Sequence, residues 1–408
     1  MFTELSPWSG ATEDNQERAG NHRMSLPGKA TKHDSRRSNL RTTLELVSHQ
    51  RQTSRAEIAR QTGLTRAAVS SLVAELLDQG LIREVGQGTS AGGKPPTLLA
   101  LNQRGRDIVA IDLGRRPFRA ALVDLGGRIH ERVDASDDPK PVRAKAAWEK
   151  TAGLIEEVLN RSAAPVLGIG VGTPGIVDAG GRVIESANLA WHNLDLAADL
   201  RNRFSIPVSV TNDAQAAALA EYRRHGAERR NLLLLKIGRG VGSGVVIDGS
   251  LYRGDHSAAG EIGHVQVQEN GELCTCGNQG CLETVASVPA ILRRMGADPE
   301  RAAWDALALA GIAGEEPVLR SIREAGRHLG RVLATVLAML DIGQVTIASD
   351  LRNAGDVLIE EVRSSIRRRM LPGTADLVEI STTPLGADLV LAGAASAVLA
   401  DRLGVVLR

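Results

Sequence analysis

Apolar residues recur at helical spacing in short stretches near the start of the chain. Leu40, Leu44 and Val47 predict a first helix that begins near Ser38. A second short helix is predicted after Ser54, whose hydroxyl can cap it. The inward positions of this second helix are Ile58 and Ala59.

A third helix follows the second almost at once. Gly63 interrupts the pattern, and Thr65 is placed to cap a helix that ends near Gly80. Its buried stripe consists of apolar residues at helical spacing, namely Val69, Leu72, Val73 and Leu76. Two helices joined by a short glycine-containing turn, the second opening with small polar residues, are typical of a helix-turn-helix.

Two short strands are predicted next, Leu81–Val85 and Pro96–Leu101, joined by a glycine-rich tip. A winged helix presents such a tip to DNA, whereas the alternative is a small helical dimerisation domain. The helix order, the glycine at the turn and the wing favour DNA binding. The residues expected nearest the bases are Thr65, Arg66, Ala67, Ser70 and Ser71, with Lys94 of the wing at the DNA backbone.

From Asp107 the pattern changes to alternating strands and helices. Two strand pairs are predicted, each with a turn that contains glycine, and they indicate two related α/β lobes. The pairs are Ile108–Leu113 with Phe118–Asp124, and Asn231–Ile237 with Gly244–Tyr252. The other predicted elements are a helix at Lys145–Ser162, strands at Val166–Val171 and Val208–Val210, and a closing helix at Leu391–Leu403.

These patterns divide the chain into three parts. Residues 1–35 are polar and rich in Gly and Pro without apolar periodicity, and we expect them to be disordered. Residues 36–102 form the predicted winged helix-turn-helix, and residues 103–408 form the α/β unit.

The composition is that of an ordinary globular protein, with 43% apolar and 24% charged residues. Aromatic residues are only 2%, so Ala, Leu, Val and Ile must build the cores. The net charge of +1 does not by itself predict a polyanionic partner. Apolar stretches such as Val332–Leu340 are much shorter than the roughly 18 residues of a membrane span, so no membrane partner is expected.

All three cysteines, Cys274, Cys276 and Cys281, fall within eight positions, and His264 lies ten residues before the first. Three thiolates and one imidazole are the ligand set that tetrahedral Zn²⁺ prefers in structural sites. Scattered buried cysteines would be the ordinary alternative, but clustering with none left over favours structural zinc. Thiols that hold a metal rather than form disulfides indicate the cytoplasm.

The residues around this cluster resemble the signature of the ROK family, which groups sugar kinases with sugar-responsive repressors. The resemblance rests on Gly-Glu-Ile-Gly-His at 260–264 and on Cys-x-Cys-Gly-x-x-Gly-Cys-Leu-Glu, which ends at Glu283. It extends over roughly residues 105–405. It implies a two-lobed actin-like (sugar kinase/Hsp70) fold with a zinc loop at 260–284. The N-terminal unit resembles the DNA-binding domain of the family's repressors, which the kinases lack.

A sugar requires carboxylates and amides at fixed angles to its hydroxyls. In the ROK pattern the sugar contacts correspond to Gly172, Thr173, Asn188, Asn212, Asp213, Glu261, His264 and Glu283. The family's histidine binds zinc through one ring nitrogen and the sugar through the other. Taken singly, Asn212 and Asp213 could instead form a turn or a helix cap, and Glu283 a solvated helix face.

The nucleotide half of the kinase pattern is altered at three turns. The turns are Asp112-Leu113-Gly114-Arg115-Arg116, Gly238-Arg239-Gly240 and Ala348-Ser349-Asp350, where the kinases carry Asp-x-Gly-Gly-Thr, Gly-Thr-Gly and Gly-Gly. Phosphate cradles need small residues that let backbone N–H groups approach the anion. Asp213, the equivalent of the kinase base, is present, but we predict no catalytic residue and no enzyme activity.

These expectations combine into one hypothesis, a cytoplasmic bacterial repressor that dimerises or tetramerises on a double-stranded DNA operator. Its ligand would be a sugar, or a sugar phosphate held by Arg115, Arg116 or Arg239. The alternative is an ATP-dependent hexokinase or glucokinase with an added DNA-binding head.

Overall fold

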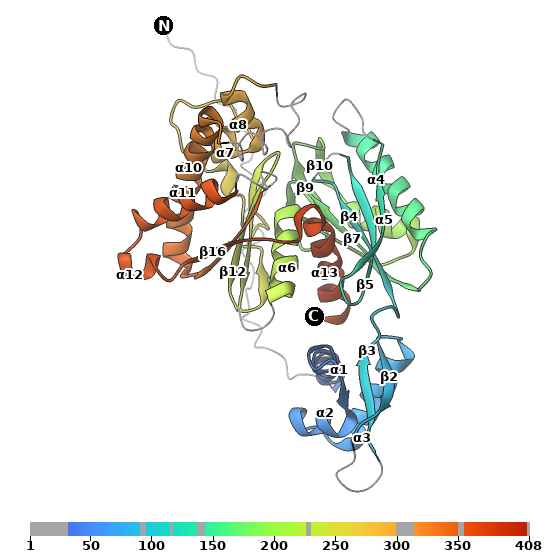
Figure 1. Cartoon of the computed structure of the whole chain (residues 1–408). Helices are drawn as coiled ribbons and strands as arrows, with labels where there is room; N and C mark the ends of the chain where they lie inside the picture. The colour runs from blue at the N-terminus through green and yellow to red at the C-terminus, as the bar shows by residue number, and fades with distance from the viewer. Residues whose placement is uncertain are drawn as a thin grey trace, which may run out of the picture.

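The computed structural model of the chain describes residues 32–89, 95–114, 117–136, 143–225, 230–298, 314–349 and 355–405. Within these ranges a small N-terminal unit lies below two α/β lobes, which stand side by side (Figure 1). Lys94 and residues 1–31 lie outside the described residues, as do Arg115, Arg116 and Asp350. None of the described helices is both long and apolar enough to cross a membrane.

The N-terminal unit is a winged helix-turn-helix. Its elements are α1 (Lys32–His49), β1 (Thr53–Ser54), α2 (Arg55–Thr62), α3 (Arg66–Asp78), β2 (Ile82–Gln87) and β3 (Thr97–Leu101). Both predicted caps are confirmed, because Ser54 Oγ accepts from the N–H of Glu57 and Thr65 Oγ1 accepts from that of Ala68. α1 begins at Lys32, six residues before the predicted start and inside the segment expected to be disordered.

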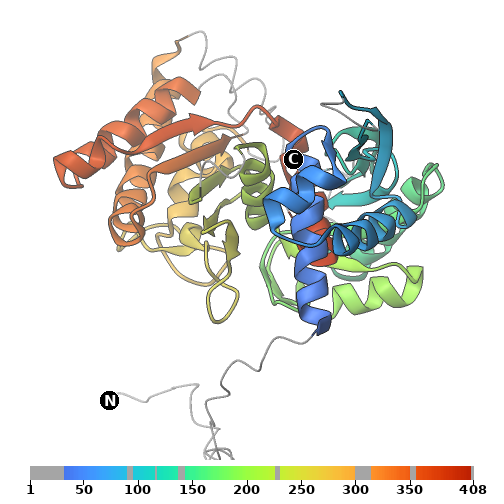
Figure 2. The ribbon, with the colours of Figure 1, turned by 90° about the horizontal axis from the view of Figure 1, so that it is seen from below.

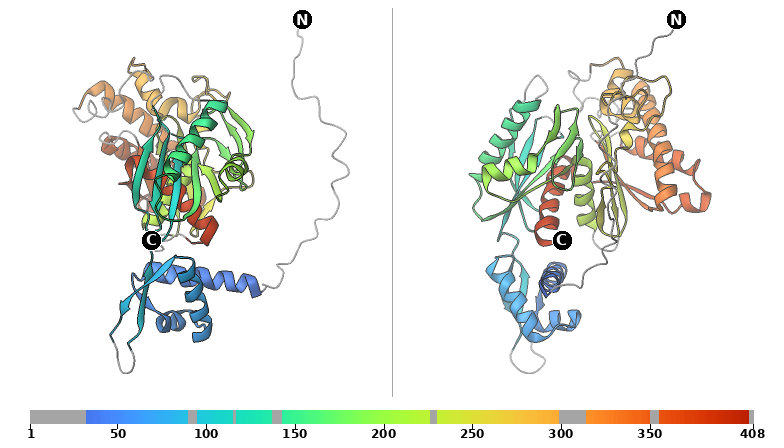
Figure 3. Two further views of the ribbon diagram at one scale, coloured as in Figure 1. Left: turned by 90° about the vertical axis from the view of Figure 1, so that its right-hand side faces the viewer. Right: turned by 180° about the vertical axis from the view of Figure 1, so that it is seen from behind.

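The helices of this unit enclose the predicted apolar stripe. All four predicted stripe residues of α3 are buried, as are Leu44, Val47 and Ile58. Three antiparallel strands in the order β1-β3-β2 complete the unit. The wing strands β2 and β3 extend away from the two lobes (Figure 3).

The first lobe contains a five-stranded sheet in the order β11-β7-β4-β5-β6. The predicted strand pair is confirmed as the antiparallel pair β4–β5, while β7 and β11 run parallel to β4. The strands are β4 (Asp107–Asp112), β5 (Arg119–Asp124), β6 (Ile129–Asp134), β7 (Val166–Thr173) and β11 (Val208–Asn212). Around this sheet lie α4 (Ala144–Leu159), α5 (Leu196–Phe204), α6 (Asp213–His225) and the small sheet of β8 (Ile176–Val177), β9 (Val183–Ser186) and β10 (Trp191–Leu194).

The second lobe repeats this arrangement in a sheet of order β14-β13-β12-β15-β16. Its strands are β12 (Leu232–Ile237), β13 (Val241–Ile247), β14 (Ser250–Tyr252), β15 (Gln344–Ser349) and β16 (Glu379–Thr382). The strand predicted at 244–252 is therefore wrong as a single element. Asp248 and Gly249 both have positive φ and form a tight hairpin turn, which divides this stretch between β13 and β14.

Two helices lie between the sheets, α6 and α13 (Leu389–Leu403) (Figure 1). Their contact is close at the backbone, because a Cβ added to Gly393 would lie 1.9 Å from the carbonyl oxygen of Ala216. On its other side α13 packs on β7, where a Cβ on Gly170 would lie 2.1 Å from the carbonyl oxygen of Ala394. Glycine is therefore required at both positions.

The second lobe carries the cysteine segment between β14 and its outer helices. This segment contains a short 3₁₀ turn, Ile262–His264, and is followed by helices that cover the sheet. These helices are α7 (Leu282–Ala286), α8 (Val288–Arg294), α10 (Glu316–Leu340), α11 (Gly355–Arg367) and α12 (Pro372–Ala375); another 3₁₀ turn, Gly386–Asp388, precedes α13.

Candidate functional site

His264 and the three cysteines converge in the second lobe. One ligand atom from each lies within 4.8 Å of all the others. The Sγ atoms of Cys276 and Cys281 are 3.7 Å apart, and Cys274 Sγ lies 3.5 Å from His264 Nδ1. Four ligands about 2.0–2.3 Å from one zinc ion would be separated by about 3.5–3.8 Å. The donor set and its spacing therefore fit a tetrahedral Zn²⁺ ion.

The three thiols differ in pKa: two have raised values, whereas the pKa of Cys276 is lowered because its burial is outweighed by hydrogen bonds such as that from the backbone of Asn278. Burial raises the pKa of Cys281 to about 12, and burial likewise raises the pKa of Cys274. Without a cation both sulfurs would be protonated at neutral pH. A bound metal replaces these protons, and its binding free energy then stabilises the folded loop.

His264 connects this cluster to a group of carboxylates. Its Nδ1 faces the sulfurs, and its Nε2 lies 3.7 Å from Glu261 Oε2. Burial raises the pKa of Glu261, and the neighbouring Asp213 and Glu283 raise it further, whereas His264 lowers it. The imidazole thus has one side for a metal and one side toward an acidic group, which fixes its orientation.

Asp213 approaches this group from the first lobe. It is the first residue of α6, directly after β11, and its Oδ2 accepts a 2.8 Å bond from Lys236 Nζ of β12. Both side chains are mostly buried, 13% and 22% exposed. Asp213 also lies against Gly114, where an added Cβ would be 2.3 Å from Oδ2. Asp213 is therefore held in an ion pair that joins the lobes.

Glu283 of α7 lies against the turn at 238–240, which joins β12 to β13. Its Oε2 accepts from the backbone N–H of Val241, and a Cβ on Gly240 would lie 2.3 Å from this oxygen. Burial raises the pKa of Glu283, as does the nearby charge of Asp213. The carboxylate of Glu283 thus accepts from a backbone N–H group of the kind that binds phosphate in a phosphate cradle.

The remaining residues nominated as sugar contacts lie at different depths. Asn212 caps α6, because its Oδ1 accepts from the N–H groups of Ala214 and Gln215. Thr173 is buried at the end of β7, and Asn188 lies exposed in the turn between β9 and β10. Gly172 is buried against α13, since an added Cβ would lie 2.4 Å from Val390. The capping alternative thus describes the side chain of Asn212.

The described residues nominated to face DNA, all of them on α3 or at its cap, share one surface of the N-terminal unit. Thr65 caps α3, and the exposed positions of its first two turns are Arg66, Ala67, Ser70 and Ser71. Arg36 of α1 reaches this surface, because its Nη2 lies 3.4 Å from Ser71 Oγ and forms an ion pair with Glu75.

Two residues were missed by the sequence analysis, Lys236 and Arg36. Lys236 is the single charged residue in the apolar run Leu-Leu-Leu-Leu-Lys-Ile, which was a signal that a buried partner exists. Arg36 is the first of two adjacent arginines at the predicted domain boundary. In both cases the partner is distant in sequence.

Comparisons with known proteins agree with this geometry. A ROK family model matches residues 108–401, and a MarR family model matches residues 42–90. The xylose repressor of Bacillus spizizenii is 28% identical over 362 residues, which cover 86% of this chain and 92% of the repressor.

Two solved structures are also similar. A ROK family transcriptional regulator, described as a homologue of the Escherichia coli protein Mlc, has a TM-score of 0.78 and 27% identity, and covers 91% of this chain and 98% of its own. A ROK family glucokinase from Streptomyces griseus, solved with glucose and AMPPNP, has a TM-score of 0.61 and 29% identity, and covers 71% of this chain and 98% of its own.

Proposed function

Because this chain belongs to the ROK family, we propose that it is a sugar-responsive DNA-binding transcriptional regulator, a repressor of carbohydrate-metabolism genes. One observation carries this proposal. The similarity to the ROK regulator extends over 91% of the chain, whereas the similarity to the glucokinase extends over 71%. The regulator thus shares more than the two lobes, and residues 42–90 match a MarR model.

The sugar would bind where the lobes meet. Asp213 of the first lobe and Glu261, His264 and Glu283 of the second lobe would accept from or donate to its hydroxyls, with Thr173, Asn188 and the second amide N–H of Asn212 nearby. Zn²⁺ held by His264, Cys274, Cys276 and Cys281 would fix the imidazole and the loop that bears the two glutamates.

The same contacts argue against phosphotransfer. A general base must be free to take a proton from the sugar hydroxyl, but Asp213 is paired with Lys236. Glu283 on the N–H of Val241 would repel a phosphate at that turn. A hexokinase is the second candidate function, because Asp213 is present and the lobes are similar to a glucokinase.

DNA recognition would follow the usual geometry of a helix-turn-helix dimer. α3 would enter the major groove with Arg66 and Ser70 toward the bases, and the wing with Lys94 would reach the backbone. Two copies, or a tetramer, would bind half-sites about 10 base pairs apart or a multiple of that. A change in lobe closure on sugar binding would alter the spacing of the two heads.

A gel-shift experiment tests this function. The full-length protein is incubated with DNA from its own upstream region, alone and with D-xylose, D-glucose, N-acetyl-D-glucosamine and their phosphates. We expect a specific shift that one compound changes. The absence of any specific shift would overturn the regulator.

A coupled assay for sugar-dependent ADP formation separates the two candidates. The regulator predicts no ADP above background with any sugar of the same panel. Turnover at ordinary kinase rates, about 1–100 per second, would establish the hexokinase instead.

A further inference from the structure

A five-residue linker, residues 102–106, joins the DNA-binding unit to the first lobe. It runs from the end of β3 at Leu101 to the start of β4 at Asp107. A linker this short, between two ordered strands, cannot act as a flexible tether. The orientation of the DNA-binding unit therefore depends on what the linker contacts.

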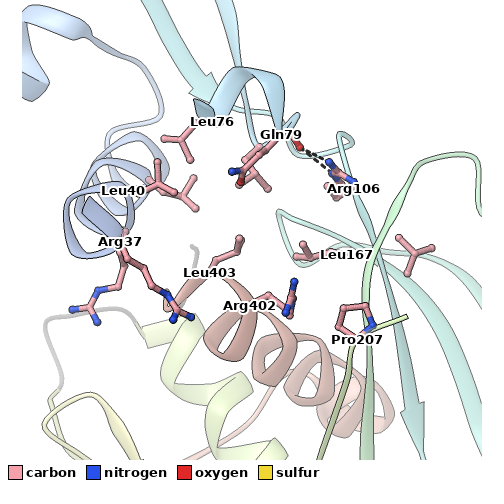
Figure 4. A pocket seen from close by; sticks show the side chains of 13 residues that line it. Arg37, Leu40, Leu76, Gln79, Arg106, Leu167, Pro207, Arg402 and Leu403 are labelled. Atoms are coloured by element: carbon pink, nitrogen blue, oxygen red, sulfur yellow. Dashed lines mark hydrogen bonds between the residues drawn. The ribbon is translucent and has the colours of Figure 1, made fainter. Parts of the chain in front are cut away.

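The linker contacts the end of the recognition helix α3. The last carbonyl groups of a helix have no partner within the helix. Here Gln79, the C-cap of α3, accepts two bonds on its carbonyl oxygen from Arg106, from Nε at 2.9 Å and from Nη2 at 2.8 Å (Figure 4). The carbonyl of Gly80 accepts from Asn102 Nδ2 at 3.1 Å.

The contact between linker and helix is close and electrostatically favourable. A Cβ added to Gly105 would lie 2.1 Å from the carbonyl oxygen of Gly80, so only glycine permits this approach. A cation at a helix C-terminus interacts favourably with the helix dipole, and bonds from a charged donor are stronger than neutral ones. Arg106 thus holds the recognition helix by its end.

The strand that follows Arg106 leads directly to the proposed sugar site. β4 is buried along its whole length, and its start is bonded to the rest of the first lobe because Asp107 accepts from Ser162 and contacts His130. At the other end of β4 lies Gly114, against which the carboxylate of Asp213 packs. A rigid strand therefore connects the carboxylate group to the end of α3.

The contact region between the N-terminal unit and the first lobe is not closely packed around Arg106. A cavity of about 500 Å³ lies between α1, α3 and the end of α13, where Leu40, Leu76, Leu167 and Leu403 line it together with Gln79 and Arg106 (Figure 4). In the view from below, the N-terminal unit lies in front of α13 and its C-terminal end (Figure 2). α3 is therefore not densely packed against the first lobe on this side, so a small displacement of α3 here requires no repacking of a dense core.

We propose that Arg106 is a positioning residue, which holds α3 at a set angle to the first lobe and passes to it the displacement of β4 that sugar binding causes. The second part rests on the function proposed above. The sugar acts on one end of β4, and Arg106 moves the helix at the other end.

Two measurements on the full-length protein test this role in R106A, R106K and R104A. Arg104 is an exposed arginine of the same linker and is the matched control. The first measurement is hydrogen–deuterium exchange of the segment 74–82 without sugar. We expect faster exchange in R106A than in the wild type or R104A, with R106K between them because lysine lacks the two-donor fork.

The second measurement is the ratio of operator affinities with and without the most effective sugar of the panel above. Coupling of the usual size makes this ratio about 5–150-fold in the wild type, and R106A should bring it close to 1 while sugar affinity by calorimetry stays unchanged. R104A should keep the wild-type ratio.

The outcomes separate the two proposals. If segment 74–82 exchanges equally in R106A and R104A, Arg106 does not position α3, whatever the sugar does. If the wild type responds to sugar and R106A responds equally, transmission through Arg106 is wrong while the regulator stands. If the wild type binds no operator or does not respond, the proposed function and the transmission both fail, and the exchange result alone decides the positioning. If R106A fails to fold, both measurements are made on R106K and on a further variant, R106Q.

Discussion

The two lobes have the same strand order but hold their carboxylates by different means. In the first lobe Asp213 directly follows β11, which is hydrogen-bonded along β7, and its helix α6 packs on α13. In the second lobe Glu261 and Glu283 flank a long irregular segment that contains only a 3₁₀ turn and two isolated bridges. The sheet therefore positions the first carboxylate. The His264 and cysteine cluster must position Glu261 and the start of α7, which carries Glu283 and is also held by the bond of Glu283 to Val241.

The difference predicts that one half of the proposed sugar site depends on metal and the other half on the fold. Backbone ladders persist as long as the lobe is folded, but a loop without a ladder has only its local contacts to keep its shape. Loss of metal should therefore leave Asp213 in place and release the glutamates.

The largest effect is expected from C281S, because it removes a buried thiol of the proposed metal site. Two carboxylate contacts of about 1–3 kcal/mol each would be lost, so sugar affinity should fall by at least about 2 kcal/mol, roughly 30-fold. Calorimetry with the sugar and determination of bound zinc check this. T275A changes an exposed residue of the same loop and should behave as the wild type. Unchanged sugar affinity in metal-free C281S would show that the carboxylates of the second lobe do not depend on the metal.

A smaller effect is expected from D213N, which removes one carboxylate and its ion pair with Lys236. Sugar affinity should fall by about 1–3 kcal/mol while the zinc content stays at the wild-type level. D356N, at an exposed position of α11, serves as the control. Loss of zinc in D213N would mean that the two halves are not independent.

Arg66 lies outside both halves of the proposed sugar site. R66A should therefore change operator binding without changing sugar binding. Arg66 is the exposed first residue of α3, so its loss should weaken specific operator binding by about 1–3 kcal/mol. Fluorescence anisotropy with labelled operator measures this change, and sugar affinity should not change. If R66A binds the operator as well as R104A does, the recognition surface has been misplaced.

The smallest effects are expected from a matched pair, G114A and G240A. Each added methyl would lie 2.3 Å from a carboxylate oxygen, of Asp213 in one case and of Glu283 in the other. Asp213 is short and ion-paired, so G114A should lower sugar affinity by about 1 kcal/mol or more, whereas the longer Glu283 can yield and G240A should cost less. Calorimetry on both variants compares the lobes directly, and the reverse order would show that the second lobe is the more rigid one.

Much of the fold could be predicted from the sequence because its signals are local. The caps Ser54 and Thr65, the stripe of α3 and the strand pair β4–β5 follow from residues a few positions apart. The error at 244–252 also concerns a local signal, because Asp248-Gly249-Ser250 interrupts the apolar pattern and Asp-Gly is typical of a hairpin turn. The predicted strand was extended through residues that indicate a turn.

The site was less accessible to prediction, because its contacts join distant segments. The ion pair of Lys236 with Asp213 spans 23 residues, and the bond of Glu283 to Val241 spans 42. Which side chains meet across the lobes depends on how the two sheets are placed, and no local pattern contains that information. Gly172, which the family resemblance nominated as a sugar contact, packs against α13, and no local pattern shows this contact.

The packing of α6 and α13 between the sheets limits which positions of the sequence can change during evolution. At Gly393 and Gly170 even a methyl group would collide with backbone atoms, which have no side chain to turn aside. Substitutions can accumulate at the proposed sugar site and on α3 and change what the protein binds, but these two glycines must stay. Among distant descendants of this protein, this pair would remain recognisable after its ligand and its operator have both changed.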